Sequence, residues 1–137
     1  MGMTRNHRFP DGFLTLVVVL HFVVTALHGW AHAGAVVPVS TSSNIFIFTV
    51  IIVAPLLGVG ILWFRSIPGG AWVVALSLTA ALLFGVVNHF VLESPDHVAR
   101  IIPQWKVLFG TTAVLLVLTE GLGAGLAFWR AVDVRAR

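Results

Sequence analysis

Four long apolar stretches constrain this chain more than any other feature of its sequence. Each is about 20 residues long, the length that a helix needs to cross roughly 30 Å of hydrocarbon at ~1.5 Å per residue. Helices are expected because the lipid interior offers no hydrogen-bond partners to an open backbone. The stretches are Phe13–Ala33, Ile45–Phe64, Ala71–Leu92 and Val107–Trp129.

The composition favours a membrane protein over a soluble one. Of the 137 residues, 58% are hydrophobic and only 9% are charged, and the mean hydropathy is +1.02. A soluble domain of this length could not bury so much apolar surface. The sequence contains no cysteine, which excludes disulfide frameworks and thiolate metal sites. The net charge of +3 comes mostly from arginines near the ends of the chain, so we expect contact with a lipid bilayer and none with nucleic acid.

The loops between the four stretches are short, which favours antiparallel neighbours. We therefore predict an all-α integral membrane protein, residues 1–137 forming one up-down-up-down bundle of four transmembrane helices. Gly121 and Gly125 lie four residues apart in the fourth stretch. This small-residue spacing is typical of close helix packing, either within the subunit or in a homo-oligomer or larger membrane complex.

Arginines define the orientation of the predicted bundle. They precede the first stretch, join the second to the third and follow the fourth, so the positive-inside rule places both termini in the cytoplasm. The compactness of the chain further predicts an integral membrane protein of a prokaryotic inner membrane. The first stretch also resembles a signal peptide that ends at Ala31–Ala33. We expect a retained span instead, because histidines are unusual inside a signal sequence. The arginines are Arg5, Arg8, Arg65, Arg130, Arg135 and Arg137.

The loop between the third and fourth stretches carries signals for a short additional helix. Ser94–Asp96 has the composition of a helix N-terminus, with serine at the N-cap followed by proline. Apolar side chains after it would lay this amphipathic helix on the outer membrane surface. They are Val98, Ile101 and Ile102.

Histidines are the least expected polar residues within these apolar stretches. At about 100° per residue, His21, His28 and His32 lie within about 40° of one another on one helix face. Such a stripe is costly against lipid, so we expect it to face the bundle interior. The outer ends of the first and third stretches lie level in an antiparallel bundle, which brings histidines and carboxylates together. The predicted site comprises His28, His32, His89, Glu93, Asp96 and His97.

Imidazole and carboxylate groups together are ligands for zinc, Cu(II) or iron. We expect His28, His32 and His89 to bind the metal directly, with Glu93 or Asp96 completing or orienting the ligand shell. The corresponding function is metal binding for uptake or delivery. One alternative is an electron-transfer subunit in which His89 and either His28 or His32 ligate haem b.

Other readings of the same histidines remain open. They can form a structural polar network, take part in proton handling, or belong to a non-catalytic accessory subunit of a larger complex. Catalytic residues are unassigned, because no nucleophile arrangement, phosphate loop or dinucleotide motif is present. If the protein is an enzyme, metal-dependent redox or hydrolytic chemistry at the outer site is expected.

Glu120 is the only carboxylate deep within a predicted span, and it lies at a depth similar to that of His21. An ionisable residue at such a depth indicates function by default. We predict a hydrogen bond between Glu120 and His21. The pair would be either a structural contact between helices or a step for a proton or metal ion moving inward.

Overall fold

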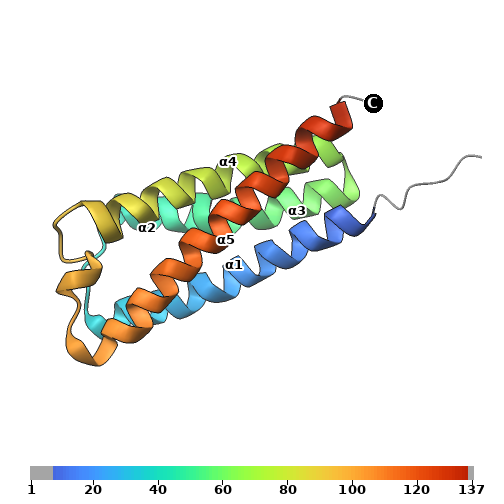
Figure 1. Cartoon of the computed structure of the whole chain (residues 1–137). Helices are drawn as coiled ribbons and strands as arrows, with labels where there is room; N and C mark the ends of the chain where they lie inside the picture. The colour runs from blue at the N-terminus through green and yellow to red at the C-terminus, as the bar shows by residue number, and fades with distance from the viewer. Residues whose placement is uncertain (1–7, 136–137) are drawn as a thin grey trace, which may run out of the picture.

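The protein is described by a computed structural model over residues 8–135, and all regular secondary structure in this range is helical (Figure 1). Arg5 and Arg137 of the predicted orientation signal lie outside the described residues. The elements are α1 (Arg8–Ala35), α2 (Thr41–Phe46), η1 (Ile47–Val53), α3 (Ala54–Phe64), α4 (Ile67–Val86), η2 (Val87–Val91), η3 (Val98–Arg100) and α5 (Pro103–Arg135). Both η1 and η2 are π-helical segments, whereas η3 is a single 3-10 turn.

Four continuous helices are long and apolar enough to cross a membrane, which confirms the main prediction from the sequence. Each helix begins three or four residues before the stretch that predicted it. The first and fourth also end later than predicted, the second ends at the predicted residue, and the third ends one residue earlier. All four expose large apolar side chains, as expected for surfaces in contact with lipid. The four helices are Pro10–Ala35, Thr41–Phe64, Ile67–Val91 and Pro103–Asp133.

The helices form a bundle in which α5 packs against both α1 and α4, and α4 packs against α3 (Figure 1). The start of α1, the end of α5 and the turn between α3 and α4 lie at one end of the molecule (Figure 1). The loop between η2 and α5 lies at the opposite end. Small and branched side chains fill the main core, among them Leu14 of α1, Leu78 of α4 and Ala127 of α5.

Gly70 allows the closest approach between α3 and α4. A Cβ atom at this position would overlap the backbone of Leu62 and the carbonyl oxygen of Gly58. Because these are backbone atoms, the two helices would have to separate to make room. The tight turn before α4 is fixed by Ser66, whose side chain accepts a hydrogen bond of 3.2 Å from the backbone N–H of Gly69.

We predict that Gly70→Ala destabilises the bundle by about 1–3 kcal/mol, because the added methyl group overpacks the crossing of α3 and α4. Gly60→Ala is the matched control, since a Cβ there meets nothing within 4 Å. It should be neutral or stabilising by about 0.5–1 kcal/mol through helix propensity. Thermal unfolding of both variants in detergent measures the difference. Equal melting temperatures would contradict the close crossing.

Gly123 of α5 packs closely within the bundle, whereas the predicted pair Gly121 and Gly125 does not. A Cβ at Gly123 would lie 2.5 Å from Leu78 Cδ1 and 3.3 Å from Val17 Cγ1. At Gly121 and Gly125 a Cβ would meet nothing within 4 Å. These two glycines therefore make no close helix contact within the subunit.

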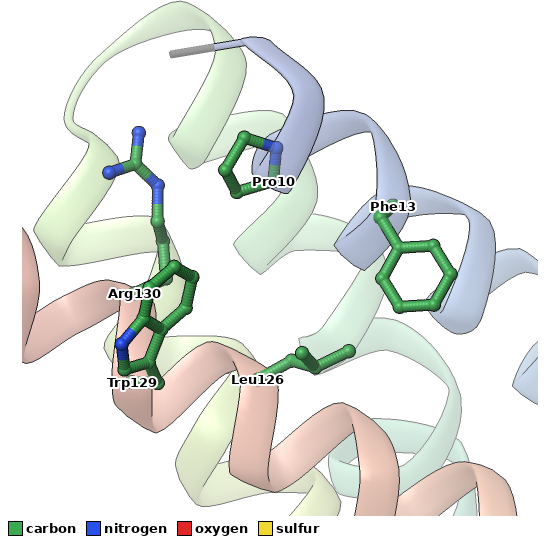
Figure 2. Close-up of a pocket in the computed structure, with 5 residues that line it drawn as sticks. All are labelled: Pro10, Phe13, Leu126, Trp129 and Arg130. Atoms are coloured by element: carbon green, nitrogen blue, oxygen red, sulfur yellow. The ribbon is translucent and has the colours of Figure 1, made fainter. Parts of the chain in front are cut away.

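A buried ion pair joins the start of α1 to the end of α5. Arg130 donates hydrogen bonds from Nε to Asp11 Oδ1 (2.6 Å) and from a terminal nitrogen to Asp11 Oδ2 (3.1 Å). Figure 2 shows Arg130 beside Trp129 and Leu126 of α5, facing Pro10 and Phe13 of α1 across an apolar groove. This pairing satisfies a charge at the end of a span in the geometry that guanidinium and carboxylate prefer.

The predicted surface helix after Ser94–Asp96 is wrong, because the structure forms only the 3-10 turn η3 there. The His97 side chain caps this turn by accepting a hydrogen bond from the N–H of Ala99. Ile101 then turns inward, where it is 5% exposed and packs with Phe109. Burial of this side chain folds the loop over the end of the bundle, and a longer helix is not formed.

Candidate metal centre

Three histidines that were predicted as metal ligands converge at the end of the bundle opposite the start of α1. His28 and His32 lie one helical turn apart on α1, and His89 lies in η2. One nitrogen atom from each lies within 4.8 Å of the others, a spacing that could hold a metal ion. His28 and His89 are buried, with exposed fractions of 6% and 5%, and His32 is partly buried.

Thr112 of α5 determines which nitrogen of His28 carries the proton. The Thr112 hydroxyl donates to the carbonyl oxygen of Leu108 at 2.7 Å, so it accepts from His28 Nδ1, which lies 2.8 Å away. His28 Nδ1 is therefore the protonated nitrogen of the neutral ring. The lone pair at Nε2 remains available to a ligand.

His89 is held in the same tautomer by Asp96. Its Nδ1 lies 3.2 Å from the Asp96 carbonyl oxygen and 3.2 Å from the carboxylate Oδ1. Both neighbours are acceptors, so Nδ1 is the donor and Nε2 carries the lone pair.

The Nε2 atoms of His28 and His89 face each other at 3.2 Å. With both rings neutral and in this tautomer, each Nε2 offers a lone pair that a cation could accept. Two nitrogen ligands of one tetrahedral zinc ion, each at ~2.0–2.1 Å, lie about 3.3 Å apart. The distance between these nitrogens is thus compatible with a shared metal ion.

His32 supplies the third nitrogen. Its Nε2 lies 3.1 Å from Asp96 Oδ1, and its Nδ1 is buried with no hydrogen-bond partner among the described residues. Partial burial alone would raise the pKa of Asp96, but the imidazoles of His32 and His89 outweigh burial and hold that pKa well below its usual value. Asp96 is therefore an ionised group that orients two imidazoles, in the manner of carboxylates behind metal-bound histidines.

The structure does not bring Glu93 and His97 into this group. Glu93 lies on the surface, where its Oε2 accepts a hydrogen bond of 3.0 Å from Arg100. His97 directs Nδ1 to the backbone of its own loop, 3.1 Å from the N–H of Ala99. The sequence places both residues near the site in depth, but the folding of the loop turns their side chains elsewhere.

A cavity of about 570 Å³ adjoins the three histidines and extends into the bundle. His28, His32 and Asp96 line it, and so does Glu120, which lies two helical turns beyond Thr112 on α5. Three protein ligands beside a cavity leave room for a further ligand on the metal, as in zinc sites that exchange water or substrate.

The hydrogen bond predicted between His21 and Glu120 is not formed. His21 Nδ1 and Glu120 Oε1 lie 3.8 Å apart, which is too long for such a bond. His21 Nε2 instead lies 3.1 Å from the carbonyl oxygen of Ile51. Pro55, four residues after Ile51, has no N–H to donate to that carbonyl, so the proline leaves it accessible to the histidine.

Thr112 and Pro55 are the residues of this region that the sequence prediction did not include. Thr112 is a polar residue in the outer half of an apolar stretch, at the level of His28. Pro55 lies inside the second stretch, where a proline disturbs the regular hydrogen bonding of a helix. These two signals were present in the sequence, but neither identifies its histidine partner without the fold.

The geometry of His28 and His89 does not fit haem. Axial nitrogens lie on opposite faces of a porphyrin, roughly 4 Å apart with the macrocycle between them. The Nε2 atoms of His28 and His89 are instead 3.2 Å apart and their ring centroids are 4.8 Å apart. This pair leaves no space for a porphyrin plane.

Comparisons with known proteins give no further guide to the site, because no family model, curated protein or solved structure matches this chain.

We predict that Thr112→Val lowers metal affinity by about 10–100-fold, because His28 loses the acceptor that fixes its tautomer. Thr119→Val is the control on the same helix, since the Thr119 hydroxyl bonds only to the backbone of its own turn. Isothermal titration with zinc measures both affinities. An unchanged affinity in Thr112→Val would show that the threonine does not support the site.

Proposed function

We propose that this protein binds a transition-metal ion through His28, His32 and His89 and serves in metal uptake or delivery. The observation that carries the proposal is the gathering of three imidazoles, each with a polar neighbour. Thr112 contacts Nδ1 of His28, Asp96 contacts one nitrogen each of His32 and His89, and one nitrogen of each ring lies within 4.8 Å of the others. A polar network built only for packing has no need to gather three imidazoles at this spacing.

We infer that the site faces outward from a prokaryotic inner membrane, with both termini in the cytoplasm. The distribution of arginines along the sequence supports this orientation. The site lies at the end of the bundle opposite the turn between α3 and α4, which carries Arg65 (Figure 1). In this arrangement the ion enters from the outer side.

The donor set favours zinc, Cu(II) or iron as the ion. Imidazole nitrogen suits each of these, whereas the sequence has neither the thiolates nor the thioether cluster that Cu(I) prefers. The adjoining cavity supports exchange of the ion over permanent structural binding, since a structural metal site is closed by a fourth protein ligand. Metal-dependent redox or hydrolytic catalysis would use the same open position.

The glycine-containing face of α5 supports assembly with another membrane helix. Gly121 and Gly125 point away from the subunit core, and Leu118 beside them is exposed. Small residues on an outward helix face allow two backbones to approach closely in lipid. We propose that a homo-oligomer or a larger membrane complex forms through this face.

We predict that His28→Ala combined with His32→Ala removes the metal ion held by the three histidines from the purified protein, because two of its three ligands are lost. His97→Ala is the control, since this histidine only caps its own loop. Elemental analysis after removal of unbound metal gives the metal content per chain. Equal content in the wild type and both variants would refute the proposed function.

A further inference from the structure

Glu120, which lines the cavity, and His21 beside it form a second group of buried polar side chains. Glu120 and His21 are 2% and 1% exposed. Glu120 Oε2 and His21 Nδ1 are buried and have no hydrogen-bond partner among the described residues. Unsatisfied polar atoms this deep in a bundle are costly, which indicates a ligand that the protein chain itself does not provide.

The tautomer of His21 directs a lone pair toward Glu120. Nε2 lies 3.1 Å from the carbonyl oxygen of Ile51, an acceptor, so Nε2 carries the proton. Nδ1 then presents its lone pair 3.8 Å from Glu120 Oε1. Glu120 Oε1 is thus the polar atom that this lone pair faces.

The separation of these two atoms distinguishes a metal ion from a shared proton. A direct hydrogen bond between carboxyl and imidazole requires about 2.6–3.0 Å. Nitrogen and oxygen ligands of one zinc ion, at ~2.0–2.2 Å, lie about 3.3–3.7 Å apart. The observed 3.8 Å is close to the second range and well outside the first.

The cavity provides the route between the two groups. Glu120 lines it together with His28, His32 and His89. Gly85 lies between the two ends, where an added Cβ would be 3.9 Å from both Glu120 Oε2 and His89 Cδ2. No side chain projects from this position, so none separates the carboxylate from His89 at this point of the cavity.

We propose that Glu120 and His21 form a second binding site for a divalent transition-metal ion, at the inner end of the cavity. Glu120 faces the cavity and binds first, and His21 Nδ1 completes the pair from behind it. The inference deepens the proposed function, because it provides the next position for an ion captured by the three histidines. The two sites share no protein ligand, so each is tested by its own variants.

Zinc stoichiometry of the full-length protein in detergent, measured by isothermal titration and elemental analysis, tests the proposal. We expect one zinc ion fewer per chain in Glu120→Gln than in the wild type, with the outer ion retained. His21→Gln should show the same loss, which guards against an effect peculiar to one variant. Glu93→Gln is the matched control, because this glutamate is exposed and pairs only with Arg100. It should bind as many ions as the wild type.

Failure of this proposal is distinguishable from failure of the proposed function. If Glu120→Gln and His21→Gln bind as many zinc ions as the wild type, the inner site is refuted. Glu120 and His21 would then serve in proton handling or in helix packing, and the proposal for the outer site would still stand. If His28→Ala with His32→Ala loses no zinc, the proposed function fails instead. Restoration of the lost ion in Glu120→Asp would support a carboxylate ligand.

Discussion

The central constraint on this protein is that an imidazole buried in an apolar bundle needs a partner for each of its nitrogens. The protein provides one partner for each ring: the Thr112 hydroxyl for His28, and Asp96 for His32 and His89. Among the described residues the second nitrogen of His32 has no hydrogen-bond partner, and those of His28 and His89 face each other. A bound cation would recover free energy that is lost by burying these groups.

The fold places these partners on separate elements. The π-helical segment η2 carries His89, and the loop after it returns Asp96 to the same point. α5 brings Thr112 against α1 because close packing around Gly123 holds the helices together. Segments of π-helix occur often at functional sites, where the wider turn redirects side chains and carbonyl groups. Both π-helical segments of this structure lie beside the cavity, since Ile47 and Ile51 of η1 also line it.

Hydropathy alone predicts the four helices, and helical periodicity together with depth predicts the meeting of His28, His32 and His89. These predictions succeed because they depend on regular geometry and on the cost of polar groups in lipid. The positions of Glu93 and His97 were not predictable in this way, since they depend on how an irregular loop folds. The extra distance between His21 and Glu120 follows from the Ile51 carbonyl, which competes for the imidazole and becomes available through Pro55. Such competition involves residues distant in sequence, and no periodic pattern records it.

X-ray absorption spectroscopy at the zinc edge tests the central claim most directly. We would load one zinc ion per chain into the Glu120→Gln variant, so that only the outer site is occupied. The account predicts three imidazole nitrogens at about 2.0–2.1 Å and one oxygen ligand such as water. A shell dominated by carboxylate or water oxygen, with no multiple scattering from imidazole rings, would contradict a centre built from His28, His32 and His89.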